Sequence, residues 1–386
     1  MRKTATLLGA AVMISAFAAP ATAATGEIRA SAGETIAGSF IVKLKDGTAT
    51  ASAQSLGSRF GGRVGHVYDT VFQGFSVRMS DAQARRLAAD PSVEYVERDQ
   101  AVSVQATQVN PPSWGIDRID QRNLPLDQRY AYNSTGSGVN AYIIDTGVRV
   151  THQDFGGRAR NGFDFVDNDS VAQDGNGHGT HVAGTVAGTL HGVAKQATII
   201  AVRVLDNNGS GTLAGVVAGI NWVASNHVKP AVANMSLGGA ANTSLDTAVQ
   251  GAITRGVTFA VAAGNSNTNA ANTSPARVAA ALTVGSTDRT DARSSFSNFG
   301  PVVDVFAPGG GITSAWNTSD TATNTISGTS MAAPHVAGVV ARYLQGGFTV
   351  TPAQVATAIT TNATDGKVTN AGANTTTRLL YWPPTS

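Results

Sequence analysis

The sequence predicts an α/β fold with a mostly parallel β-sheet, preceded by a smaller α+β unit. From Trp114 onward, β-branched apolar runs alternate with helical patterns, and these runs are continuously apolar, as in strands covered on both faces. The smaller unit follows from shorter β-rich runs and two helical stretches over residues 39–104. With 42% hydrophobic and 13% charged residues in a chain of 386, the composition is that of a compact globular protein.

Residues 1–23 have the pattern of a secretory signal peptide. Arg2 and Lys3 precede an apolar run over residues 7–19, and small residues follow Pro20. The run is shorter than the roughly 20 residues that a membrane-spanning helix needs. We therefore expect a secreted chain without a membrane anchor.

Residues 39–104 are expected to form a β-α-β-β-α-β unit. Its β-rich runs lie at 40–44, 75–79 and 93–96. The clearer helix begins at a cap formed by Ser80 and Asp81 and ends before Pro91. Over residues 99–112 the periodicity is lost, which predicts a domain boundary.

The main domain is expected to alternate strands with helices. The strands are predicted at 139–144, 199–205, 257–263, 282–284 and 302–306, and the helices near 212–226, 244–255, 330–345 and 352–362. In such sheets, ligand sites form beyond the carboxyl ends of the strands.

Charge and cysteine content exclude several classes of function. Lys and Arg total 27 against 25 Asp and Glu, so the net charge of +2 gives no reason to expect nucleic acid or an anionic membrane as a partner. The chain has no cysteine, which excludes a thiol nucleophile, a Cys-ligated zinc and an iron–sulfur cluster.

Three glycine-containing segments each carry a reactive side chain: Asp145 in 143–147, His178 in 176–184 and Ser330 in 327–338. Taken singly, each has an ordinary explanation, because Asp caps turns and Ser caps helices. The histidines at 178 and 181 lack the third ligand of a zinc-protease pattern.

Together the three segments supply an orienting carboxylate, a base and a nucleophile in the chain order Asp, His, Ser. A hydroxyl needs a neutral imidazole to take its proton, and a carboxylate must hold that imidazole in the right tautomer. Asp145, His178 and Ser330 can fill these roles. Asn265, after the apolar run 257–263, is the candidate second donor of an oxyanion hole.

The sequence gives less support to two other functions. An α/β-hydrolase esterase would place its serine in Gly-x-Ser-x-Gly, whereas this chain has Gly328-Thr329-Ser330-Met331-Ala332. A catalytically inactive, protease-like binding protein is the other alternative, but all four candidate catalytic residues are present.

These motifs resemble the subtilisin family, and within it the proteinase K-like branch, nearest to the aqualysin-like enzymes. The resemblance covers about 114–382 and an inhibitor-type propeptide at 39–104. It implies a three-layer subtilisin-like α/β domain at 106–386, preceded by a ferredoxin-like propeptide within 24–105. The implied function is a secreted, monomeric serine endopeptidase that processes itself from a zymogen.

The resemblance also implies a substrate channel that binds the peptide main chain as a neighbouring strand. Its residues would be Gly209, Ser210, Gly211, Ser236, Leu237, Gly238 and Gly239. Leu237 with Ala262, Ala263 and Gly264 would wall an apolar pocket for the residue before the scissile bond. We therefore expect broad specificity with an apolar or aromatic preference.

In the resembling enzymes the propeptide is an intramolecular chaperone and inhibitor, and its tail, residues 102–105, would lie in the active site like a product. Maturation should release a chain that begins near Ala106. The alternative is that residues 39–104 remain as a permanent accessory domain.

Structural calcium is implied as well, bound by carboxylate and carbonyl oxygens. One site would use Asp304 with the carbonyls of Ala279 and Ala281. Another would use Asp117, Asp120, Gln121 and Asp127, for which a solvated acidic turn is the alternative. Aqualysin-like enzymes carry cysteines where this chain has Gly175, Asn207, Ala271 and Val302. Because this chain lacks those disulfides, we expect calcium to stabilise its loops instead. No catalytic cofactor is expected.

Overall fold

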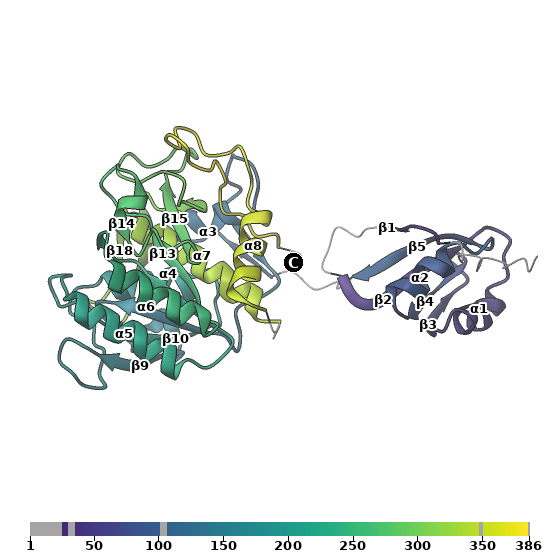
Figure 1. Ribbon diagram of the computed structural model, residues 1–386, viewed down its shortest axis with the longest axis horizontal. Helices are drawn as coiled ribbons and strands as arrows, with labels where there is room; N and C mark the ends of the chain where they lie inside the picture. The colour runs from purple at the N-terminus through teal and green to yellow at the C-terminus, as the bar shows by residue number, and fades with distance from the viewer. Residues whose placement is uncertain (1–24, 30–34, 101–105, 347–349, 385–386) are drawn as a thin grey trace, which may run out of the picture. The chain divides into compact units, whose positions relative to one another are not determined.

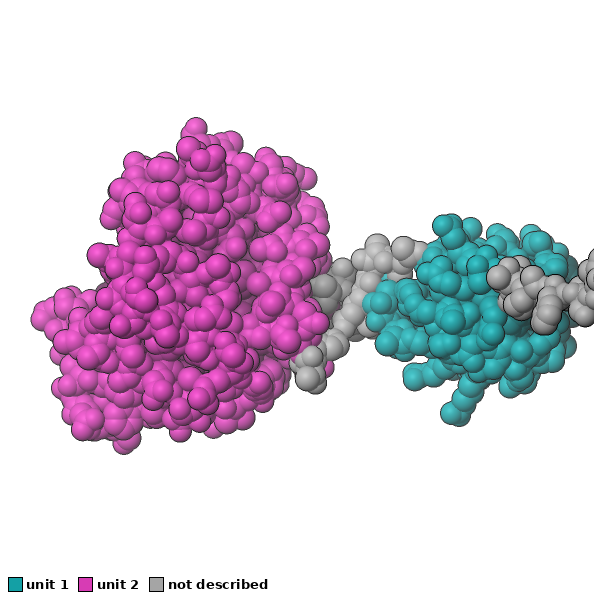
Figure 2. All heavy atoms as spheres, viewed as in Figure 1, with its two compact units in different colours: residues 1–102 teal, residues 103–386 magenta. Residues whose placement is uncertain are grey.

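The computed structural model describes residues 25–29, 35–100, 106–346 and 350–384 (Figure 1). These fall into two compact units, the first ending at Val102 and the second beginning at Ser103 (Figure 2). The predicted signal peptide and the tail of the predicted propeptide lie outside the described residues. None of the helices in the described ranges is long and apolar enough to cross a membrane.

The first unit is a five-stranded sheet with two helices, and it confirms the β-α-β-β-α-β prediction. Its strand order is β1-β5-β2-β4-β3. The elements are β1 Ile28–Arg29, β2 Thr35–Leu44, α1 Ala53–Arg59, β3 Arg63–Tyr68, β4 Gly74–Arg78, α2 Asp81–Ala88 and β5 Val93–Gln100. The hydroxyl of Ser80 accepts from Gln83 N and the Gln83 side chain accepts from Ser80 N, so a capping box begins α2. Ser80 is thus the cap, as predicted, whereas Asp81 is already the first residue of the helix.

The second unit is built on a seven-stranded, all-parallel sheet with the order β16-β15-β13-β11-β8-β10-β9. Its strands are β8 Asn140–Asp145, β9 Ala159–Asp164, β10 Thr198–Arg203, β11 Ala231–Met235, β13 Thr258–Ala262, β15 Leu282–Thr287 and β16 Val305–Pro308. Its helices are α3 Trp114–Ile119, α4 His178–Ala187, α5 Leu213–Asn226, α6 Thr243–Thr254, α7 Thr329–Leu344 and α8 Pro352–Asn362.

Helices cover both faces of this sheet, which gives three layers. Alternate residues of β8 enter two different hydrophobic clusters, Ile143 in one and Ile144 in the other. The cluster with Ile143 includes α4, α7 and α8, and the cluster with Ile144 includes α5 and α6. Continuous apolar runs in the sequence therefore correspond to strands buried on both faces.

Two strands of this sheet, β9 and β11, were not predicted, and a third, β16, is displaced from its predicted bounds. The run predicted at 302–306 forms a strand only over Val305–Pro308. The strand β11 was not predicted at all, because its alternating alanines and Asn234 give a weak β signal. This strand lies in the middle of the sheet, between β13 and β8, and it leads directly to Ser236.

The short strand β6, Ala106–Val109, belongs to the second unit. It pairs antiparallel with β7, Arg129–Tyr132. The side chain of Gln108 adds two bonds, accepting from Lys195 Nζ at 2.6 Å and donating to Leu190 O at 3.0 Å. Residues 106–109 are thus fixed to the rest of the second unit.

Candidate active site

Asp145 is the last residue of β8, a central strand of the parallel sheet. Its side chain is fully buried. One carboxylate oxygen, Oδ1, accepts from Thr146 N at 2.8 Å and meets His178 Nδ1 at 2.7 Å. A carboxylate at this edge of the sheet lies where ligand sites of parallel sheets form.

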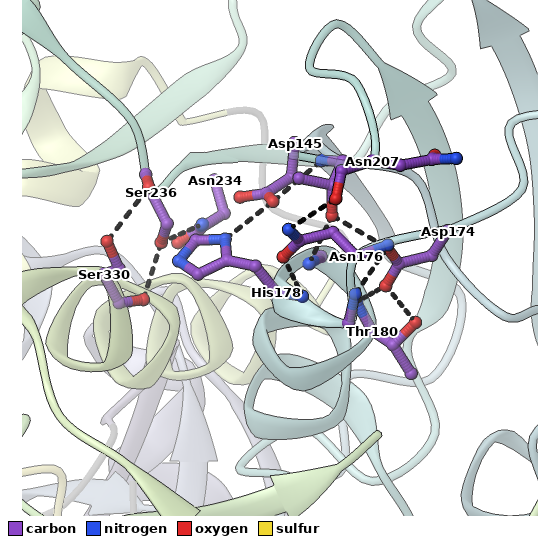
Figure 3. Close-up of polar contacts among 12 residues, drawn as sticks. Asp145, Asp174, Asn176, His178, Thr180, Asn207, Asn234, Ser236 and Ser330 are labelled. Atoms are coloured by element: carbon purple, nitrogen blue, oxygen red, sulfur yellow. Dashed lines mark hydrogen bonds and ion pairs between the residues drawn. The ribbon is translucent and has the colours of Figure 1, made fainter. Parts of the chain in front are cut away.

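His178 is the first residue of α4, and its side chain is 25% exposed. Its imidazole lies between Asp145 and Ser330 (Figure 3). Burial alone would lower the pKa of His178, but the carboxylates of Asp145 and Asp174 outweigh burial and hold this pKa above the usual value of an imidazole. The Nδ1 atom is engaged by Asp145, which leaves Nε2 as the nitrogen that can take a proton.

Ser330 lies in the first turn of α7, after Gly328. Its hydroxyl donates to the carbonyl of Ser236 at 3.0 Å, and the hydroxyl of Ser236 donates to the carbonyl of Ser330 at 2.7 Å (Figure 3). The position near a helix start also places the Ser330 backbone at the positive end of the helix dipole.

Asn265 follows β13, and its amide orientation is set by Thr329. Its Oδ1 accepts from both Thr329 N and Thr329 Oγ1 at 2.8 Å. Because the oxygen is occupied by two donors, the Nδ2 hydrogens are directed to the other side, where they can serve a ligand. Thr329 Oγ1 in turn accepts from Gly264 N at 3.1 Å.

Gly264 has a φ of +104°. A side chain there would also collide with Asn298, whose Nδ2 lies 2.4 Å from the position of a Cβ. Glycine is therefore required at this turn.

Two cavities bring together the residues predicted for a substrate channel. The larger, about 670 Å³, is lined by Gly209, Ser210, Gly211, Ser236, Leu237, Gly238 and Gly239 together with His178. The smaller, about 320 Å³, is lined by Ala262, Ala263, Gly264, Asn265 and Ser330, and it also shares Leu237, Gly238 and Gly239. A continuous channel beside the candidate triad follows from the shared residues.

The sequence analysis did not identify the residues that support the candidate catalytic residues through hydrogen bonds. Asp174 accepts hydrogen bonds from the first turn of α4 and from Thr146, and Thr329 fixes the amide of Asn265. Asp174 lies in the run Asp174-Gly175-Asn176-Gly177, whose composition is typical of an exposed turn. The sequence therefore gives no sign that Asp174 is only 2% exposed. Thr329 stands next to Ser330, and that adjacency was the available signal.

The predicted calcium ligands near α3 form a loop with unusual carboxylates. Burial raises the pKa of Asp117 to about 6 and that of Asp120 to about 7. One oxygen of each, Oδ1 in both cases, is buried without a hydrogen-bond partner within the described part of the chain. Gln121 Oε1 accepts from Asp127 N at 3.3 Å, which closes the loop.

At the other predicted calcium site, Asp304 precedes β16, and Ala279 and Ala281 lie just before β15. Thr283 N donates to Asp304 Oδ2 at 2.8 Å, and burial raises the pKa of Asp304 to about 6. Across residues 25–29, 35–100, 106–346 and 350–384, no three carboxylate or imidazole side chains converge as a metal site. Carbonyl, amide or water oxygens would have to complete the coordination of a cation.

Comparison with known proteins identifies the family. The model of the subtilase family, peptidase S8, matches residues 136–378, and the model of peptidase inhibitor I9 matches residues 39–105. The chain belongs to the subtilase family. An extracellular serine proteinase of Thermus sp. (strain Rt41A) is 58% identical over 323 residues, which cover 84% of this chain and 78% of the relative. Proteinase R of Parengyodontium album is 42% identical over 355 residues, which cover 90% of each chain.

A solved structure described as a cold adapted subtilisin-like serine proteinase is 58% identical, with a TM-score of 0.68. The superposed region covers 69% of this subtilase and 97% of the chain in the solved structure. The protein is therefore a serine endopeptidase of the proteinase K-like branch, with a subtilisin-like domain and an I9 inhibitor-type propeptide domain. These comparisons give no support to the alternative of an inactive binding protein.

Proposed function

We propose that Ser330 is the nucleophile of this endopeptidase, His178 its general base and Asp145 the carboxylate that orients the base. The observation that carries the assignment is the 2.7 Å contact between Asp145 Oδ1 and His178 Nδ1, with the imidazole placed toward Ser330 (Figure 3). His178 Nε2 takes the proton of Ser330 Oγ as that oxygen attacks the scissile carbonyl carbon, and returns it to the leaving amine. Water then hydrolyses the acyl-enzyme by the same route.

In the structure, Ser330 Oγ donates to Ser236 O, and the catalytic proton transfer requires this hydroxyl to turn toward the imidazole. Hydrogen bonds of catalytic groups commonly tighten only when the substrate is bound. The tetrahedral oxyanion would be stabilised by Asn265 Nδ2 and by the Ser330 backbone N–H at the start of α7. The fixed amide orientation of Asn265 supports this role, since no reorganisation is needed during the reaction.

We infer that the substrate main chain lies between the segments 209–211 and 236–239. Both segments border the larger cavity, so an extended peptide between them can bond to each as a neighbouring strand. Among the residues that the structure describes, no Asp, Glu, Lys or Arg lines the smaller cavity, so these residues offer no charge to select a basic side chain. Hydrolysis after apolar and aromatic residues should exceed hydrolysis after Arg or Lys in a peptide library; equal rates would contradict this.

We propose that residues 1–23 direct export and are removed, and that residues 24–105 form the self-cleaved inhibitor. The I9 match over 39–105 ends at the proposed junction. Ala106 lies in the hydrogen-bonded strand β6 and pairs with Tyr132 of β7 in the second unit, which supports a mature enzyme that includes this strand. We further propose that the mature enzyme, residues 106–386, acts as an extracellular monomer.

We also propose two structural calcium sites, one at Asp117, Asp120, Gln121 and Asp127 and the other at Asp304 with the carbonyls of Ala279 and Ala281. The unpartnered buried oxygens of Asp117 and Asp120 support the first, and the half-buried carboxylate of Asp304, with its raised pKa, supports the second. Bound calcium would neutralise these carboxylates and tie the loops together, with no part in bond cleavage.

The substitution Ser330→Ala in the full-length chain tests the proposed mechanism. The expected result is an uncleaved precursor without peptidase activity. Ser236→Ala, which removes only the hydroxyl that bonds to the Ser330 carbonyl, should retain measurable activity. Normal maturation by purified Ser330→Ala protein, with casein still degraded, would overturn the assignment.

A further inference from the structure

Asp174 joins the two segments that carry Asp145 and His178. It precedes α4 and is only 2% exposed. Its carboxylate accepts five hydrogen bonds. Oδ1 accepts from Thr146 Oγ1 at 2.9 Å, Asn176 N at 2.9 Å and Gly177 N at 2.8 Å. Oδ2 accepts from Thr180 N at 2.9 Å and from Thr180 Oγ1 at 2.5 Å. Figure 3 shows this cluster on the side of His178 away from Ser330.

Only a carboxylate can satisfy this arrangement of donors. An amide has a single acceptor oxygen, so Asn at this position would turn its NH₂ group toward either the Oδ1 donors or the Oδ2 donors. Thr180 N cannot act as an acceptor. Thr180 Oγ1 already accepts from Arg149 N at 3.0 Å, so it is also poorly able to receive the NH₂ group.

The hydrogen bonds run directly between the two catalytic segments. Thr146 follows Asp145 in the sequence, and its Oγ1 donates to Asp174 while accepting from Gly179 N at 2.9 Å. Gly179 follows His178. Asp174 therefore fixes the end of β8 and the first turn of α4 to the same pair of oxygens.

We propose that Asp174 is a positioning residue for His178: it holds the first turn of α4 against the end of β8, so that the imidazole meets Asp145, and it supplies a second negative charge beside the imidazolium. This inference rests on the triad assignment above. Asp174 contacts neither the substrate nor the reacting atoms.

The electrostatic part of the proposal can be separated from the geometric part. Three titratable groups act on His178 or are affected by it: Asp145 on β8, Asp174 before α4, and His181 one turn along α4. Burial lowers the pKa of His181 to about 3, so it is neutral near pH 7 and adds no charge. Asp145 and Asp174 both favour the charged form of His178.

The test is Asp174→Asn, made in the full-length chain and matured by trace wild-type enzyme where it does not mature itself. Active sites are counted by titration with a serine-directed covalent reagent. We expect kcat per active site to fall about 10- to 100-fold, as for a misplaced catalytic group, with little change in KM. The acid limb of kcat/KM should move to lower pH, because the remaining imidazole has lost one neighbouring negative charge.

Asp154→Asn is the matched control. Asp154 is also a buried carboxylate, 5% exposed, but it serves the other end of α4, accepting from Leu190 N at 2.6 Å and from His191 Nδ1 at 2.9 Å. Its variant should lose thermal stability and keep the wild-type acid limb. If Asp174→Asn behaves in the same way, with its acid limb unmoved, Asp174 is merely structural and the proposal fails.

Thr146→Val provides a second variant if Asp174→Asn does not fold. It removes the hydroxyl that links Asp174 to β8 and keeps the Asp174 charge. We expect a lower kcat with an unshifted acid limb, and an unchanged kcat would overturn the positioning role. Failure of the triad itself is distinguishable, because only then would Ser330→Ala retain activity.

Discussion

Removal of the Asn265 side-chain amide should slow turnover far more than it weakens substrate binding. Asn265→Leu keeps the approximate volume and deletes the Nδ2 donor that we assign to the oxyanion. We expect kcat to fall roughly 10²- to 10³-fold, a range that comes from subtilisin, a relative of this chain, rather than from its own structure. KM should change little, because the oxyanion exists only in the transition state.

The structure allows a finer prediction for the residue that holds this amide. Thr329→Val deletes one of the two hydrogen bonds to Asn265 Oδ1 and leaves the bond from Thr329 N, at 2.8 Å, in place. It also removes the acceptor of Gly264 N. A neutral hydrogen bond contributes about 1 kcal/mol, which corresponds to a roughly fivefold change in kcat. The two effects should not add, because Thr329 acts through Asn265.

The assay is a double-mutant cycle with a chromogenic peptide substrate, with rates corrected for titrated active sites. In the Asn265→Leu background, Thr329→Val should have almost no further effect on kcat. A loss below tenfold for Asn265→Leu would contradict the oxyanion assignment. A Thr329→Val effect of full size in that background would show that Thr329 acts by another route.

Three further predictions concern stability, oxidation and pH. Chelation of calcium should lower the midpoint of thermal unfolding, because the buried oxygens of Asp117 and Asp120 would then lack a counter-charge. Readdition of Ca²⁺ should restore the midpoint more fully at pH 8 than at pH 5, because protons compete for the carboxylates at the lower pH. An unchanged midpoint after chelation would count against both sites. Peroxide should lower kcat, because Met331 is 1% exposed beside Ser330 and its sulfoxide is bulkier and polar, and Met331→Leu should resist this loss. Wild-type kcat/KM should fall with acidification through a pKa above that of an ordinary imidazole, because the proposed base His178 must be neutral to accept a proton and its pKa is raised. An acid limb at or below the ordinary imidazole pKa would refute the charge balance described for the site.

The sequence predicted most of the sheet because burial on both faces requires long β-branched runs, as in β8 and β10. It failed at β11, where Ala231, Ala233 and Asn234 replace such residues. Pairing of β11 with its neighbours β13 and β8, rather than intrinsic β propensity, determines the conformation of this segment. The missed strand matters for the site because it delivers Ser236 to Ser330.

The residues of the proposed triad could be selected from the sequence because each lies in a short segment with a distinctive pattern of neighbours. Their supporting residues could not, because the contacts join distant parts of the chain. Thr329 holds a residue 64 positions earlier, and Asp174 holds a hydroxyl 28 positions earlier. The direction of the Ser330 hydroxyl toward Ser236 O likewise depends on tertiary packing, which local patterns do not specify.

The pairing of β6 with β7 has a consequence for the lifetime of the enzyme. β7 directly follows the loop of Asp117, Asp120 and Asp127, and Gln128 N and Ala131 N donate to the carboxylates of Asp117 and Asp120. The end created by maturation would thus be held by the same short stretch of backbone that encloses the proposed ion. Loss of that ion would loosen the new amino terminus first, and offer an extended, detached segment to neighbouring copies of the protease. In a calcium-poor medium, residues 106–109 would then become a site at which the enzyme can digest itself.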